Sequence, residues 1–120
     1  MSNDSKTFMF ILRGGASPED LTPEQRQQLI KKYTDWMGQL GSRGQLKGGE
    51  PLEDEGKVLS GKGGKVITDG PFAEVKEQVG GYFMILAKDL NEAAEIARGC
   101  PIFENGGTIE VRPIQVMPGM

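Results

Sequence analysis

The residues of this chain best suited to chemistry gather around one carboxylate, Asp69, which is followed by Gly70, Pro71 and Phe72. Asp69 comes where an apolar run stops: glycine permits a positive φ, proline fixes the next turn, and Phe72 can fold back as an apolar plug. A carboxylate held at a strand end can bind a ligand or act as a general base. It can equally form an Asx turn and cap its own backbone, and the sequence leaves both roles open.

Other polar side chains are candidates for the same site. Arg13 ends an apolar run, where its guanidinium could hold a carboxylate or phosphate through two parallel hydrogen bonds. A simple ion pair at a strand end is the competing role for Arg13, and a cross-strand pair is the expected role of Arg112 beside Glu110. We take Asp69 as the candidate catalytic residue. The predicted ligand-binding residues are Arg13, Glu50, Asp69, Gly70, Pro71, Phe72, Lys76 and Tyr82.

The composition excludes several kinds of site. The chain has no histidine, so it cannot form a Ser–His–Asp triad, a Cys–His pair or a histidine metal site by itself. Its single cysteine, Cys100, is expected to be a buried structural thiol, because only Arg98 is near enough in sequence to activate it. We therefore expect no cofactor and no metal; hard, oxygen-bound cations such as magnesium or calcium are the only ions that this composition could hold.

The charge and the apolar runs bear on partners and location. The 14 basic and 17 acidic residues give a net charge of −3, which argues against direct binding of nucleic acid. The longest apolar run, residues 8–12, is too short to cross a bilayer, and the first residues lack the pattern of a secretory signal. Together with the single cysteine, these features predict a cytoplasmic protein with no membrane partner.

The 120 residues fit one domain, 1–120, with loose ends expected at 1–6 and 117–120. A first helix is predicted from Pro23, with Thr22 as its N-cap and Gln25 closing a capping box. Gly41 is its expected end. A second helix is predicted over 90–98, where Asp89 and Glu92 have the spacing of a capping box.

Apolar or alternating runs predict the strands. The main strands are expected at 8–12, 45–52, 82–87 and 108–112. Two further arms, 58–59 and 65–68, flank a glycine-rich turn that is typical of a hairpin. The runs at 8–12 and 82–87 are alike, and each precedes a capped helix and another strand. Two βαβ-like halves of this kind predict an α+β, ferredoxin-like sandwich: an antiparallel sheet with two helices on one face, plus a hairpin insert.

This layout also predicts assembly. Two helices can cover only one face of such a sheet, yet the run at 8–12 is apolar at consecutive positions, so both of its faces need cover. Large exposed apolar patches are unusual on monomers. We therefore expect a homodimer in which two sheets pack face to face around a shared core, a dimeric α+β barrel.

The segment from Ile67 to Glu77, ITDGPFAEVKE, resembles the signature of DGPF-domain proteins of the YCII-related superfamily. The segments 80–83, 100–101 and 107–113 extend the resemblance, which runs from about Phe8 to Ile114. It implies a ferredoxin-like fold, a dimeric α+β barrel and, for most members, no established activity. A His–Asp pair has been proposed as the catalytic centre of YCII relatives; Asp69 matches its aspartate, but this chain has no histidine to match the other half.

Three functions remain open at this point. The first is the binding of a small, unidentified ligand in a pocket near the dimer interface, around the Asp-Gly-Pro-Phe turn. The second is an enzyme acting on a small metabolite, with Asp69 as general acid or base beside Arg13, Lys76 or Tyr82. The third comes from the resemblance alone: DGPF-type proteins are often linked with sigma factors, which implies a regulatory partner of transcription proteins.

Overall fold

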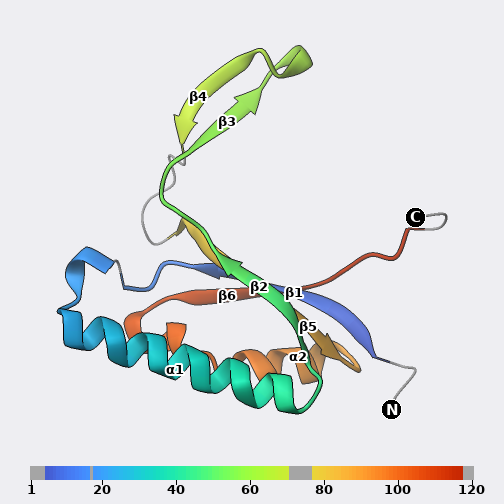
Figure 1. The fold of residues 1–120 in the computed structure, drawn as a ribbon. Helices are drawn as coiled ribbons and strands as arrows, with labels where there is room; N and C mark the ends of the chain where they lie inside the picture. The colour runs from blue at the N-terminus through green and yellow to red at the C-terminus, as the bar shows by residue number, and fades with distance from the viewer. Residues whose placement is uncertain (1–4, 17, 71–76, 118–120) are drawn as a thin grey trace.

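A computed structural model describes residues 5–16, 18–70 and 77–117, and its centre is a four-stranded antiparallel sheet (Figure 1). The strand order is β2-β5-β1-β6. These strands are β1 (Lys6–Arg13), β2 (Leu46–Pro51), β5 (Val79–Ala87) and β6 (Thr108–Pro113). The helices α1 (Pro23–Ser42) and α2 (Leu90–Ala97) lie together on one face of the sheet (Figure 1). The predicted α+β class is confirmed, and the order of helices and strands is compatible with a ferredoxin-like fold.

The first helix begins as the sequence predicts and ends later. The hydroxyl of Thr22 accepts a hydrogen bond from the Gln25 amide at 3.1 Å, and the Thr22 amide donates to the Gln25 side chain at 2.9 Å. The predicted stop at Gly41 is wrong, because α1 continues to Ser42. Gly44 ends it instead: its φ of +70° is left-handed, and its amide donates to the Gly41 carbonyl at 3.0 Å.

Three smaller boundaries also differ from expectation. At α2, Asp89 caps the Glu92 amide at 2.8 Å, but the Glu92 carboxylate accepts from the Lys88 amide at 2.9 Å, so the capping box is displaced by one residue. The helix ends at Ala97, one residue before the predicted end. Lys6 already belongs to β1, so the expected loose start is too long. Residues 1–4 and 118–120 of the predicted loose ends lie outside the described residues.

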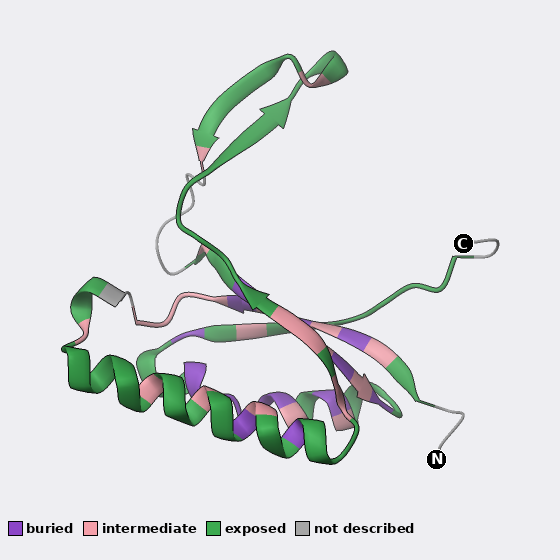
Figure 2. Ribbon diagram, viewed as in Figure 1, coloured by how far each residue is buried: buried purple, intermediate pink, exposed green. Residues whose placement is uncertain are grey.

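The core lies between the helices and the sheet (Figure 2). Alternate residues of β1 and β5 point toward the helices and are buried. Across the layer, the Trp36 ring of α1 meets the Phe83 ring edge-on, with 5.1 Å between centroids, and Tyr33 stacks on Phe83 at 6.5 Å. The helix-facing core residues of β1 and β5 are Phe8, Phe10, Leu12, Phe83, Ile85 and Ala87.

The opposite face of the sheet, which we call the open face, is apolar at its centre. The strands β1 and β5 place Met9 beside Met84 and Ile11 beside Tyr82 on this face, and all four side chains are half-buried in the single chain. The strand at 8–12 therefore does present apolar side chains to both faces of the sheet, as the sequence predicts.

A separate two-stranded sheet forms the predicted hairpin insert. Its strands are β3 (Gly56–Ser60) and β4 (Val66–Gly70), and the turn between them contains a 3-10 segment, Lys62–Gly64. The hairpin leaves the end of β2 and projects from the side of the sheet opposite to the helices (Figure 1). All of β3 and all of β4 except Gly70 are exposed (Figure 2).

Candidate functional site

A cavity of about 660 Å3 lies between the first three quarters of α1 and the adjoining ends of β1, β2 and β5. Leu29, Tyr33 and Met37 of α1 line it, and their spacing places them on one side of the helix. Phe83 of the sheet also lines it, and so does Ile102 of the 3-10 helix Pro101–Asn105. The volume lies within the range of pockets that hold small molecules, roughly 300–1,000 Å3.

Glycines on the sheet explain why this end of the layer is hollow. Gly81 is buried and belongs to the helix-facing series of β5, and Gly49 of β2 lies directly opposite Phe83. Gly81 therefore sends no side chain into the space under α1, whereas the Phe83 ring occupies the space that a side chain at Gly49 would need.

The same two glycines let β2 and β5 approach closely. A Cβ at Gly49 would lie 2.6 Å from the Phe83 ring and from the Tyr82 carbonyl oxygen, and a Cβ at Gly81 would lie 3.0 Å from the Glu50 carbonyl oxygen. Glycine is therefore required at Gly49, and the backbone would have to shift at Gly81.

Two predicted ligand-binding residues come together at the cavity. Glu50 and Tyr82 both line it, and they are opposite partners in the β2–β5 ladder. The lining includes six further polar residues, which are Arg26, Thr34, Glu53, Asp54, Gln78 and Asn105. Most of its surface is nevertheless apolar, and polar groups set in an apolar lining are typical of sites that bind and orient a small molecule.

Tyr33 lines the cavity and lies near the buried thiol of Cys100, and the two side chains affect each other's pKa. Burial raises the pKa of Tyr33, and the neighbouring Cys100 adds to the increase. Burial also raises the pKa of Cys100, although hydrogen bonds from the Ile102 backbone and from Tyr33 act in the opposite direction. Cys100 is therefore a protonated, buried thiol, in agreement with the structural role expected of it.

Asp69 and Gly70 lie on the hairpin. The Asp69 side chain is 87% exposed, and its carboxylate accepts a 2.9 Å hydrogen bond from the Lys57 ammonium on the opposite strand. Gly70, the last residue of β4, pairs with Gly56. The predicted ligand set is thus divided between the cavity and the hairpin. The remaining predicted residues Pro71, Phe72 and Lys76 lie outside the described residues.

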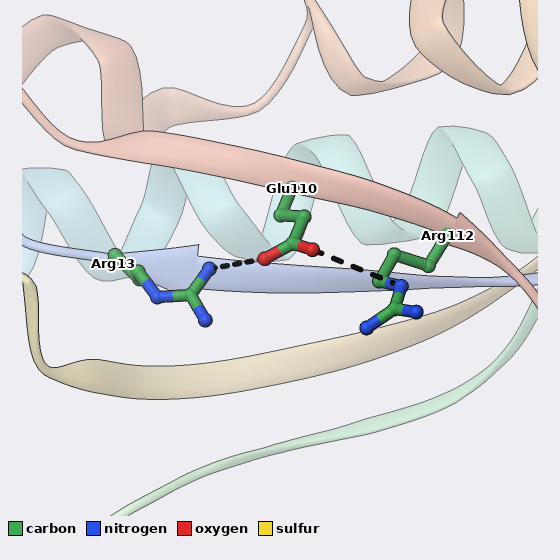
Figure 3. Close-up of polar contacts among 3 residues, drawn as sticks. All are labelled: Arg13, Glu110 and Arg112. Carbon is green, nitrogen blue, oxygen red and sulfur yellow. Dashed lines mark hydrogen bonds and ion pairs between the residues drawn. The ribbon is translucent and has the colours of Figure 1, made fainter.

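Arg13 faces away from the cavity. Leu12 and Gly14 line the cavity, whereas the Arg13 side chain lies on the open face and donates to Glu110 of β6 at 2.6 Å (Figure 3). Arg112 approaches the other Glu110 oxygen at 3.7 Å (Figure 3). The strand-end ion pair expected for Arg13 is present. Arg112 approaches Glu110 of its own strand, β6, whereas a cross-strand pair was the expectation.

The described part of the chain contains neither a candidate metal-binding cluster nor a helix suited to crossing a membrane. Residues 5–16, 18–70 and 77–117 contain no cluster of three or more histidine, cysteine or acidic side chains placed to hold a metal ion. Neither α1 nor α2 combines the length and apolarity needed to cross a bilayer, and no other helix of these residues does.

The sequence was compared with known proteins. The model of the YCII-related domain matches residues 8–118, which is nearly the whole chain. The chain belongs to the YCII-related family. An uncharacterized protein of Rhizobium meliloti (strain 1021) is 34% identical to it over 85 residues, which is 70% of this chain and 65% of that relative. The chain thus spans slightly less than two thirds of the length of this curated relative.

The glycines that line the cavity of this YCII-related protein were not recognised from sequence. The strand predicted at 82–87 begins after Gly80-Gly81, whereas the structure places Gly48-Gly49 within β2 and Gly80-Gly81 within β5. One signal was available: Gly81 precedes Phe83 by two residues and so shares its face of the strand. Glycine at such a position indicates a gap or a close backbone approach.

Proposed function

We propose that this YCII-related protein binds a small, largely apolar molecule in the cavity between α1 and the sheet. The observation that carries this proposal is the 660 Å3 cavity at the helix-facing glycines Gly49 and Gly81. The cavity is partly open to solvent, so a small molecule could enter it from the surface. Its mostly apolar wall surface suits a ligand with an apolar body.

The polar residues of the lining suggest where the ligand carries its polar group. Arg26 carries a guanidinium that donates hydrogen bonds, and Asn105 carries an amide that donates and accepts. Glu50 and Tyr82 also border the cavity, but they are partners in the β2–β5 ladder whose side chains belong to the open face. A ligand with a hydroxyl or carbonyl group at one end would suit Arg26 and Asn105 while its apolar part contacts Leu29, Met37 and Phe83.

We also propose that the protein works as a homodimer in which two open faces meet. Met9, Ile11, Tyr82 and Met84 form an apolar strip at the centre of this face, with the Arg13–Glu110 ion pair beside it. Cover by a second copy would bury that strip in an isologous interface. Because Tyr82 belongs to the strip and also lines the cavity, the ligand would bind near the interface.

A thermal-shift screen against a metabolite library tests the cavity. A molecule present well above its dissociation constant raises the melting temperature of the wild type by mass action. The variant Leu29→Trp fills the cavity and should lose the shift, whereas Gln28→Trp, on an exposed position of the same helix, should keep it. A shift that survives in Leu29→Trp would show that the ligand binds elsewhere.

The same screen addresses Asp69. Loss of the shift in Asp69→Asn, with the cavity variant unaffected, would place binding at the hairpin and reopen the general-base hypothesis, to be tested by turnover of the same compound. We prefer binding because the Asp69 carboxylate is well solvated and paired with Lys57. No contact within the described residues specifically favours a transcription partner, and that hypothesis stays a prediction from resemblance.

A further inference from the structure

The β3–β4 hairpin carries more apolar surface than a free arm in water should. Val58 and Leu59 of β3 are 45% and 60% exposed, and Val66 and Ile67 of β4 are 53% and 57% exposed. An isolated two-stranded hairpin is marginally stable in water, because it has no layer against which to bury such residues. The exposed apolar side chains therefore indicate a missing contact.

The register shows how these side chains are arranged. Leu59 lies opposite Ile67 and Lys57 lies opposite Asp69, so these four share one face of the hairpin, which we call the Leu59 face. The other face carries Val58 opposite Thr68 and Val66 opposite Ser60. The Leu59 face thus presents an apolar pair next to an ion pair, the combination found where the apolar centre of an interface meets its polar rim.

The shape of the molecule indicates where the missing contact lies. The radius of gyration is 16.3 Å, whereas a compact domain of this length has about 14 Å. The hairpin contributes to the difference, because it projects beyond the sheet on the side of the open face, opposite to the helices (Figure 1). Any macromolecule bound to the open face would therefore lie beside the hairpin.

The distribution of charge favours a second copy of this chain as the molecule bound to the open face. Residues 56–70 contain three lysines and one aspartate and so carry a net charge of +2, whereas the whole chain carries −3 and the remainder therefore −5. Lys57 is paired with Asp69, which leaves the excess positive charge at the tip with Lys62 and Lys65. A basic tip on an acidic protein is attracted to another molecule of the same kind.

We infer that the β3–β4 hairpin is a clasp, whose Leu59 face packs against a second copy of the chain seated on the open face. The inference rests on the proposed homodimer and goes beyond it, because the open faces could meet without any contribution from the hairpin. One consequence concerns Asp69: it would meet the partner subunit and not the cavity of its own chain.

Sedimentation equilibrium tests the clasp. In the double variant Leu59→Thr/Ile67→Thr the hairpin keeps its β-propensity but loses the apolar pair, and the dimer should dissociate roughly 100-fold more readily, since four side chains are changed per dimer. Val58→Thr/Val66→Thr, on the other face, is the matched control and should change the dissociation constant by less than about fivefold. Equal weakening in both variants would overturn the assignment to the Leu59 face.

A third variant separates the clasp from the dimer itself. Met84→Glu places a charge at the centre of the open face and should yield monomers, because an unpaired charge cannot be buried there. If Met84→Glu dissociates the dimer while Leu59→Thr/Ile67→Thr stays within about threefold of the wild type, the clasp is rejected and the dimer stands. A wild type that is monomeric throughout would reject both.

A cross-linking experiment observes the contact directly. A photoreactive p-benzoylphenylalanine in place of Leu59 should yield a covalent dimer after irradiation. In a mixture of isotopically light and heavy subunits, mass spectrometry should find the cross-link between chains. Cross-links confined to single chains, or none, would overturn the inference.

Discussion

The two ends of the layer between α1, α2 and the sheet are built differently. At one end Ile85 and Ala87 of β5 are buried, with 0% and 2% exposure, in the same core as Ala93 and Ala97 of α2. At the other end the helix-facing position of the same strand is Gly81, and a cavity replaces side-chain packing. One strand thus contributes to a filled core and to a hollow site. The difference is the volume of the side chains that alternate along it.

The two helices also differ between the filled end and the hollow end of the layer. Small residues of α2 let it lie close to the filled end, whereas α1 carries the larger Tyr33, Trp36 and Met37 toward the middle and the hollow end. The rings of Trp36 and Tyr33 both contact the Phe83 ring. On the helix-facing side of β5, Phe83 is the neighbour of Gly81. Phe83 therefore marks the boundary between the two ends, and we expect stability to come mainly from one side of it and ligand binding from the other.

The largest predicted effect is at the filled end. Ile85→Ala removes a fully buried side chain and should lower the free energy of unfolding by about 2–5 kcal/mol, measured by urea denaturation followed by circular dichroism. Leu29→Ala, at the half-buried cavity wall, should cost less than about 1.5 kcal/mol because it enlarges a space that is already open. Equal losses at the two positions would mean that the ends do not differ in this way.

The next effect tests the glycines. Gly81→Ala should destabilise the protein by about 1–3 kcal/mol, because its Cβ would lie 3.0 Å from the backbone oxygen of Glu50. Gly80→Ala is the matched control: a Cβ there has nothing within 4 Å, so the change should be neutral or stabilising by up to about 1 kcal/mol. Denaturation of both variants checks the pair, and a harmless Gly81→Ala would contradict the close approach of β2 and β5.

A smaller effect concerns the helix wall of the cavity. Thr22→Ala removes the hydroxyl that caps the Gln25 amide and should cost about 1 kcal/mol in thermal or urea unfolding. Because the first half of α1 lines the cavity, ligand-induced stabilisation should weaken as well. Thr68→Ala removes a hydroxyl that donates a 3.4 Å hydrogen bond to the Val58 carbonyl on the hairpin, away from the cavity, and as a control it should leave the ligand-induced stabilisation unchanged.

The smallest effect is a loss of stability at alkaline pH. The pKa values of Cys100 and Tyr33 are both raised in the folded protein, so the unfolded chain releases these protons first. Stability is therefore complete below the unfolded value of Cys, about 8.5, and falls as the pH rises above it. The loss should stay below about 1 kcal/mol, because the interactions of Cys100 with the Ile102 backbone and Tyr33 offset part of the effect of burial and Tyr33 is only half-buried. Unfolding curves between pH 7 and 10 measure it.

The variant Cys100→Ala isolates the thiol in that experiment. It removes one of the two titrating groups, so its stability should depend less steeply on pH than that of the wild type. An identical or steeper dependence would assign the alkaline loss to groups elsewhere in the chain.

The sequence by itself determined the features that depend on neighbours along the chain. Thr22, Pro23 and Gln25 specify the start of α1 because a capping box needs only three consecutive peptide units. The continuous apolar run of β5 and the alternation along β6 specify strands, and the glycine-rich turn at 60–64 specifies the hairpin through an allowed positive φ. The succession of these elements was enough to predict the α+β class.

Only the tertiary structure decided where the candidate site lies. Arg13 meets Glu110 across 97 positions, and Glu50 meets Tyr82, because the register of the sheet brings those strands together. The hairpin places Asp69 away from the cavity for a similar reason. The residues of a strand do not determine where its end lies relative to the rest of the fold. Gly81 leaves a cavity only because α1 passes over it. Contacts between distant segments depend on how whole elements pack, and no local pattern encodes that packing.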